Sequence, residues 1–284
     1  MLKLRVLTAF IGLPIIIGLF AFGPMIIAFA LLLGCALICV HETHDLISPR
    51  LAKALVGEQG WGASRDVVGE FLALGTAVAV MVAAAFAPER SWEYSIVFGV
   101  IIQIGVGVFS RQSPEEALAR VLSALMSFAY GCLPWLAIYD LYILGADARY
   151  LFFLLAIVWC GDTGAYFGGK VWGKTQLAPI RSPKKTWEGA LSGLSASMLG
   201  GVVTYFVFND HFAGIFVVCL ASALGGIAGQ LGDLIESTLK RFAQVKDSSS
   251  LLPGHGGFLD RVDGILFAAP FVWYVLYLTG VSPH

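Results

Sequence analysis

Residues 150–168 read Tyr-Leu-Phe-Phe-Leu-Leu-Ala-Ile-Val-Trp-Cys-Gly-Asp-Thr-Gly-Ala-Tyr-Phe-Gly, an apolar run with one carboxylate, Asp162. A run of this length can cross the hydrocarbon core of a bilayer as a helix. Burying an unpaired carboxylate in hydrocarbon is costly, so such an acid usually faces a wet cavity or a cation. The stretch therefore predicts a membrane helix with a functional acid. The alternative is a carboxylate paired with a lysine for packing alone.

The composition of the whole chain agrees with a membrane protein. Hydrophobic residues make up 58% of the 284 residues and charged residues 13%, against about a quarter charged in a typical soluble domain. Mean hydropathy is +0.81. The five cysteines lie in apolar runs without a C-x-x-C pair, which argues against disulfides and zinc. The net charge of −1 gives no basic field, so we expect no nucleic-acid partner.

Apolar runs predict an all-α, polytopic integral membrane protein with about nine transmembrane helices. The expected helices cover residues 5–22, 24–40, 71–88, 94–110, 120–144, 150–168, 188–208, 213–238 and 264–280. No linker separates parts of the chain, so we expect a single membrane domain over 1–284. Within it, 1–149 supply N-terminal spans and 150–284 carry the polar clusters. A cleaved signal peptide is the less favoured alternative for the first run, because a second span follows directly.

The basic residues predict the orientation. With nine spans, 16 of the 18 Lys and Arg residues fall on the N-terminal side, and only Arg90 and Arg149 fall on the other. The positive-inside rule then places the N-terminus in the cytoplasm. The longer connections, 41–70, 169–187 and 239–263, lie on that same side. We therefore expect the functional site at the cytoplasmic face.

The first polar cluster covers residues 161–189. It contains Gly168-x4-Gly173-Lys174-Thr175, which matches a Walker A loop in letters but lacks the preceding strand and following helix. The turn Ser182-Pro-Lys-Lys185-Thr186 opens the seventh helix and presents a lysine, a hydroxyl and free backbone N–H groups. Such a helix start suits a phosphate group.

The second polar cluster covers residues 232–263. Asp233, Glu236 and Ser237 are spaced i, i+3 and i+4, so they share one helical face. Asp260 and Asp263 are likewise i and i+3 at the start of the last helix. If the loop folds back, these acids meet and predict a Mg²⁺ site beside basic residues that suit a triphosphate. The alternative is a solvated, salt-bridged loop.

At these residues the chain resembles a known family. The pattern Ser237-x-Leu-Lys-Arg-x4-Lys-Asp-x-Ser-x2-Leu-Pro-x-His-Gly-Gly-Phe-x-Asp-Arg-Val-Asp263 is similar to the signature of phosphatidate cytidylyltransferases, also called CDP-diacylglycerol synthases. The 161–189 cluster resembles that family as well. One departure is His41-Glu-Thr-His44, where the family usually flanks the glutamate with aromatic residues. It falls one residue short of H-E-x-x-H, so we interpret it as an interfacial polar exit from the second span.

The resemblance implies that CTP and phosphatidic acid give CDP-diacylglycerol and pyrophosphate at the cytoplasmic face of a bacterial inner membrane. It implies Mg²⁺ on Asp233 and Asp260, with Asp263 as third ligand or orienting group; a second cation stays open. Lys185, Lys240, Arg241 and Lys246 would hold the triphosphate or pyrophosphate, and Arg261 or Lys170 the lipid phosphate.

The resemblance and the residue types together define the predicted site. The predicted catalytic residues are Asp233, Ser237, Lys240, Arg241, Lys246, Asp247, His255, Asp260, Arg261 and Asp263. The predicted substrate-binding residues are Asp162, Lys170, Lys174, Ser182, Lys185 and Thr186. The expected partners are CTP, phosphatidic acid and the bilayer, and a homodimer stays open.

Two other functions compete with this interpretation. A transporter or channel would place polar groups near mid-membrane, whereas only Asp162, Asp140 and Gln103 are embedded here. Another lipid transferase is less favoured, because the sequence has neither the D-G-x2-A-R alcohol phosphotransferase motif nor a D-D-x-x-D prenyl site.

Overall fold

The computed structural model describes residues 18–57, 66–87, 91–145, 148–208, 212, 214–252, 254 and 256–281. The elements, in chain order, are α2 (Met25–Val56), α3 (Val67–Phe86), α4 (Ser91–Val108), α5 (Pro114–Gly131), α6 (Leu133–Leu144), α7 (Arg149–Trp172), β1 (Gln176–Ala178), β2 (Ser182–Thr186), α8 (Trp187–Phe208), α9 (Ile215–Ala243) and α10 (Leu259–Leu278). Within the described residues, eight helical segments are long and apolar enough to cross a membrane. The prediction of an all-α polytopic membrane protein is confirmed.

The predicted spans match the helices from the second span onward. The fifth span corresponds to α5 and α6 together, one helical segment over Pro114–Leu144 that breaks at Cys132. Pro134 lies in the first turn of α6 and has no N–H to continue the ladder of α5. The first predicted span, 5–22, lies outside the described residues except for 18–22, which are helical.

Helix α2 is longer than the sequence predicts. It has 32 residues, against roughly 20 needed to cross the bilayer core. The predicted connection 41–70 therefore begins as helix, and the expectation of a loop directly after residue 40 is wrong. The polar side chains that follow Val40 do not break a helix. Helix α2 ends at Val56, and the next residue, Gly57, has a φ of 88°, which suits a residue without Cβ.

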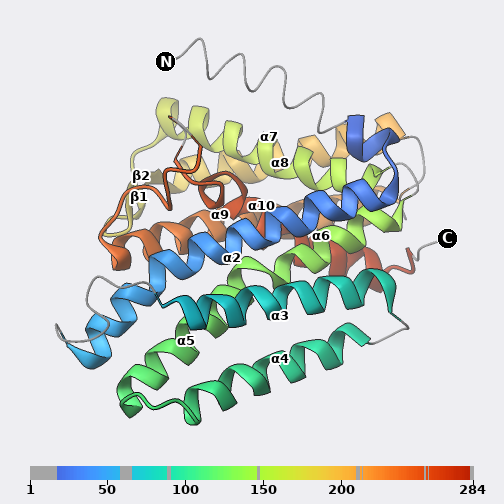
Figure 1. Cartoon of the computed structure of the whole chain (residues 1–284). Helices are drawn as coiled ribbons and strands as arrows, with labels where there is room; N and C mark the ends of the chain where they lie inside the picture. Colours follow the sequence, from blue (N-terminus) through green and yellow to red (C-terminus); the bar gives the residue numbers. More distant parts are fainter. Residues whose placement is uncertain are drawn as a thin grey trace. The chain divides into compact units, whose positions relative to one another are not determined.

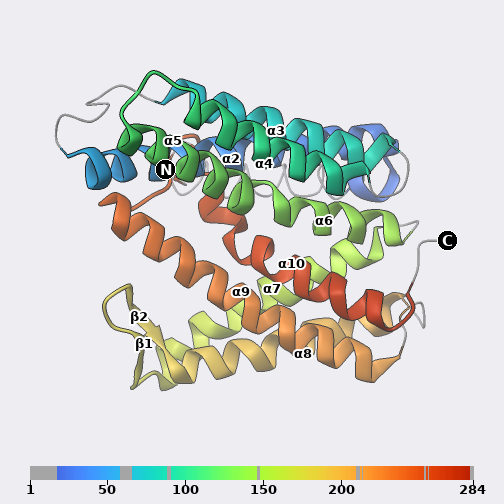
Figure 2. The same ribbon diagram turned by 90° about the horizontal axis from the view of Figure 1, so that it is seen from below.

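The described chain forms two compact units, and the first holds α2 to α5 with residues 239–260. Helix α3 lies between α2 and α4 in Figure 1, and Figure 2 shows α3 and α4 close to α5. Helix α2 also packs along α5, where a Cβ on Gly131 would lie 2.5 Å from the Val40 nitrogen. Asp66 caps α3 at the Gly69 N–H and accepts a hydrogen bond from Arg120 Nε at 2.8 Å, which ties α5 to the start of α3.

The second unit holds most of α6, then α7, the β1–β2 hairpin, α8, α9 to Thr238, and α10 from Arg261. Helices α7 and α8 run side by side (Figure 1). Gly161, Gly164 and Gly168 form one face of α7, against small side chains of α8. Small residues let two membrane helices approach closely. The single membrane domain over residues 1–284 stays a prediction.

We expect Gly164→Ala to destabilise the second unit. The added Cβ would collide with Ala196 and lie 3.0 Å from the carbonyl oxygen of Ser192. Such overpacking costs about 1–3 kcal/mol, so thermal unfolding in detergent should shift down by several degrees. Gly75→Ala in α3 is the matched control, because nothing lies within 4 Å of its Cβ. Equal melting temperatures for the two variants would contradict close α7–α8 packing.

Candidate active site

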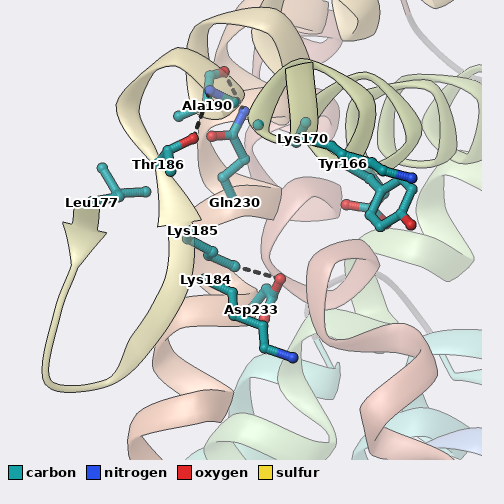
Figure 3. A pocket seen from close by; sticks show the side chains of 13 residues that line it. Tyr166, Lys170, Leu177, Lys184, Lys185, Thr186, Ala190, Gln230 and Asp233 are labelled. Carbon is teal, nitrogen blue, oxygen red and sulfur yellow. Dashed lines mark hydrogen bonds and ion pairs between the residues drawn. The ribbon is translucent and has the colours of Figure 1, made fainter. Parts of the chain in front are cut away.

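A cavity of about 410 Å³ opens in the second unit between α7, the hairpin, α8 and α9. We call it the α7–α9 pocket. Its lining residues are Asp162, Ala165, Tyr166, Gly169, Lys170, Leu177, Lys184, Lys185, Thr186, Gly189, Ala190, Gln230 and Asp233. Figure 3 shows Lys185 reaching from β2 towards Asp233 on α9, with Lys170 and Tyr166 on α7. The pocket therefore combines carboxylates with three lysines.

One ion pair joins two walls of the pocket. Lys185 Nζ contacts Asp233 Oδ2, and the two side chains are 26% and 41% exposed. A pair this open to solvent contributes at most about 1 kcal/mol to stability. Both side chains line the cavity. An incoming phosphate could therefore replace Asp233 at Lys185, and an incoming cation could replace Lys185 at Asp233.

The start of α8 forms another part of the pocket. The Thr186 hydroxyl accepts a hydrogen bond from the Gly189 N–H at 3.1 Å and so caps the helix. The Glu188 carboxylate accepts from the N–H groups of Lys174 and Thr175, which fixes the entry of the hairpin against the helix. Lys185 and Thr186 are thereby held at a helix N-terminus, as predicted for phosphate binding.

The Walker A resemblance has no structural basis. Residues 168–172 are the end of α7, and β1 follows from Gln176. A P-loop needs a strand before the loop and a helix after it, and here the order is reversed. The position of each residue relative to the pocket therefore indicates whether it can bind a phosphate there. Lys170, Lys184 and Lys185 line the pocket, whereas Lys174 and Ser182 do not.

Three carboxylates of the second unit lie close together. Asp233 and Glu236 on α9 and Asp263 on α10 each offer an oxygen within 4.8 Å of the others. We call these residues the acid triad. Glu236 is only 1% exposed. Like charges at this separation raise each other's energy unless a cation is present, and oxygen ligands of this kind suit Mg²⁺.

The triad contains two of the three predicted metal ligands. The third member of the triad is Glu236, which the sequence pointed to only as a neighbour of Asp233 on one helix face. The i, i+3 spacing was the signal that could have identified it. Asp233 also lines the α7–α9 pocket, so the triad and the lysine wall meet at this one side chain.

Asp260 has other partners in the first unit. Its carboxylate accepts hydrogen bonds from Lys240 Nζ at 2.8 Å and from the N–H groups of Ser248 at 3.0 Å and Gly257 at 2.8 Å. The carboxylate thus organises the loop between α9 and α10. Its predicted role as a metal ligand stays a prediction.

The remaining predicted site residues that the structure describes are at least partly exposed. Arg241, Lys246, Asp247 and Arg261 are exposed, and Ser237 is partly exposed. His255 lies outside the described residues, so its predicted role stays a prediction.

Other residues that contribute to these sites were not predicted from the sequence. Lys184, Gln230 and Tyr166 line the pocket. Glu42, which we interpreted as part of an interfacial exit, is 1% exposed and hydrogen-bonded to the 248–259 segment. Its neighbours are also engaged: His41 Nδ1 lies 2.7 Å from Glu70 Oε1, and His44 Nε2 lies 3.1 Å from the Asp66 carbonyl oxygen.

Comparisons with known proteins identify the family. A family model described as the cytidylyltransferase family matches residues 3–279. A protein named phosphatidate cytidylyltransferase from Staphylococcus haemolyticus is 34% identical over 274 residues, 95% of this chain and 97% of its own length. One of that name from Staphylococcus epidermidis is 34% identical over 281 residues, 98% of this chain and 100% of its own. Another, from Bacillus subtilis, is 43% identical over 129 residues, 45% and 48% of the two chains. The chain therefore belongs to the cytidylyltransferase family.

Proposed function

We propose that this chain converts CTP and phosphatidate into CDP-diacylglycerol and pyrophosphate for phospholipid biosynthesis. The full-length similarity to phosphatidate cytidylyltransferases supports this reaction. The observation that carries it is the position of Asp233, which belongs to the acid triad and also lines a pocket with three lysines. A carboxylate cluster next to a cationic wall is the arrangement that a metal-bound triphosphate needs.

The acid triad has the donor set for the Mg²⁺ that the family implies. Mg²⁺ binds oxygens at about 2.1 Å, so two ligands on opposite sides of it lie about 4 Å apart. Carboxylate oxygens within 4.8 Å of one another match that span after small side-chain rotations. Asp233, Glu236 and Asp263 would hold the ion, and a bound Mg²⁺ would neutralise part of the triphosphate charge. A second cation beside it stays open.

The reaction asks for positioning and charge neutralisation rather than for a strong base. The phosphate of the lipid is already ionised near neutral pH, and one of its oxygens attacks the α-phosphorus of CTP. A new P–O bond forms there, and the bond from the α-phosphorus to the bridging oxygen breaks, so pyrophosphate leaves with that electron pair. Lys185 and Lys184 would hold the phosphates against the start of α8, where Thr186 and backbone N–H groups lie.

The lipid can reach the pocket from the bilayer side of α7. Tyr166 and Phe167 are exposed apolar residues on this helix, and Lys170 Nζ lies 6.0 Å from the centre of the Tyr166 ring. A lysine whose stem runs along an aromatic side chain keeps its ammonium group in water at the interface. Lys170 is therefore our candidate for the lipid phosphate.

We expect Lys185→Ala to raise the KM for CTP about tenfold, because losing a charge-assisted hydrogen bond costs about 1.5–3 kcal/mol and 1.4 kcal/mol is tenfold. The KM for phosphatidate should change much less. Arg181→Ala is the control: it removes a positive charge from the same hairpin, at its turn and outside the pocket lining. Equal effects of the two substitutions on CTP would refute a specific role for Lys185.

We expect Asp263→Asn to raise the Mg²⁺ concentration needed for pyrophosphate release about tenfold or more, because the amide keeps the shape of the side chain and removes one ligand charge. Initial rates across a Mg²⁺ titration measure this. Asp140→Asn is the control, since Asp140 is an acid of the same unit outside the triad. An unchanged titration for Asp263→Asn would remove the metal assignment.

We also propose that the pocket opens to the cytoplasm and that the N-terminus lies there, since the basic residues favour that orientation. A single cysteine at Lys174→Cys, in a variant without the native cysteines, tests this with a membrane-impermeant maleimide. The reagent should label inverted vesicles and spare intact spheroplasts. Labelling of intact spheroplasts would reverse the orientation.

A further inference from the structure

The Glu42 carboxylate makes four hydrogen bonds to one segment distant in sequence. Its Oε1 accepts from Ser249 Oγ at 2.5 Å and from the Phe258 N–H at 2.9 Å. Its Oε2 accepts from Ser248 Oγ at 3.0 Å and from the Leu259 N–H at 2.7 Å. All these residues belong to the first unit. Glu42 is 1% exposed, so its charge is compensated by these donors rather than by water.

Two of the four donors lie at the beginning of α10. The first backbone N–H groups of a helix have no partner inside it, and a side chain next to them in sequence usually accepts their hydrogen bonds. Here the acceptor is Glu42 on α2, 217 positions away from Leu259. A negative charge at this end of a helix is favourable because of the helix dipole. Glu42 therefore caps α10 from another helix.

One of the other two donors, Ser248, couples Glu42 to Asp260. Ser248 donates its hydroxyl to Glu42 and its backbone N–H to Asp260, which also accepts from the Gly257 N–H and from Lys240 Nζ. Two carboxylates thus hold the segment that carries Lys246 and Asp247. Neither carboxylate can shift without breaking a hydrogen bond to Ser248.

The atoms around Gly257 are closely packed. A Cβ on Gly257 would lie 2.8 Å from Glu42 Oε2 and would collide with the Ser248 hydroxyl. Gly256 adopts a φ of 84°, which favours glycine. The Leu252 N–H donates to the Gly256 carbonyl oxygen at 3.0 Å. These contacts fix Gly257 against Glu42 and Ser248.

We propose that Glu42 is a positioning residue for catalysis: it fixes the conformation of the segment that carries Lys246 and Asp247, residues that the sequence predicts to take part in catalysis. A carboxylate needed only for packing could be replaced by an apolar side chain at no cost to the chemistry. All the hydrogen bonds given above for Glu42 go instead to the segment with the predicted nucleotide-binding residues. The proposal rests on the proposed function for its catalytic part and on geometry alone for its structural part.

Glu42→Gln tests the proposal, because an amide cannot accept at both ends and leaves at least one donor of the segment without its partner. Two readouts apply. The first is the rate of tryptic cleavage after Lys246, an exposed residue, in full-length protein without substrate. The second is the KM for CTP and for phosphatidate. Glu70→Gln is the matched control: Glu70 is a buried glutamate of the same unit that accepts from His41.

We expect Glu42→Gln to speed cleavage after Lys246 and to raise the KM for CTP, each about tenfold, as the loss of one charge-assisted hydrogen bond predicts. The KM for phosphatidate should stay within about twofold, and Glu70→Gln should change neither readout. A merely structural loss would lower the amount of active enzyme and leave the KM for CTP as it is. Cleavage at the wild-type rate, or equal effects of the two substitutions, would overturn the proposal.

The double variant Ser248→Ala/Ser249→Ala keeps the carboxylate and removes two of its donors, so it serves if Glu42→Gln does not fold. We expect faster cleavage and a higher KM for CTP from it as well, and wild-type values for both would overturn the proposal. The cleavage readout needs no turnover. If wild-type protein did not use CTP, the proposed function would fail while cleavage still decided whether Glu42 holds the segment.

Discussion

The close approach of three carboxylates is the feature on which the proposed site depends. Asp233 and Glu236 share a face of α9 because they are one helical turn apart, and Asp263 approaches them from α10. Their oxygens lie within 4.8 Å of one another, and Glu236 has almost no access to water. In such a setting the energy of like charges is far higher than in bulk water. The contact of Lys185 with Asp233 supplies one positive charge, and we propose that a bound divalent cation supplies two more.

Carboxylates serve a different purpose in the first unit. Glu42 and Asp260 accept hydrogen bonds from hydroxyl and backbone N–H groups, and Asp260 also from Lys240. Such donors satisfy a carboxylate and fix the geometry of a loop at the same time. The same functional group therefore has two uses in this chain, and the neighbours of each carboxylate decide which: other acids in the triad, and N–H or O–H donors around Glu42 and Asp260.

The sequence could predict whatever depends on hydropathy or on short spacing. The apolar runs from 24–40 onward predicted the membrane helices, and the basic turn before residue 187 predicted Lys185 and Thr186 at the start of α8. The i, i+3 spacing placed Glu236 beside Asp233. The hydrogen bonds of Asp260 could not be predicted in this way, because they depend on where α10 starts: with Leu259 as its first residue, Asp260 accepts from backbone N–H groups of the preceding loop. The role of Glu42 could not be predicted from the sequence, because its hydrogen-bond partners lie more than 200 positions away and no periodicity links them.

The most direct measurement is a turnover assay of the purified full-length chain in vesicles that contain phosphatidate, with labelled CTP, in the presence and absence of Mg²⁺. The account predicts that CDP-diacylglycerol and pyrophosphate form in equal amounts and only when both phosphatidate and Mg²⁺ are supplied. Formation of neither product under these conditions would contradict it. So would pyrophosphate release that does not depend on phosphatidate, since the lipid phosphate would then not be the attacking group.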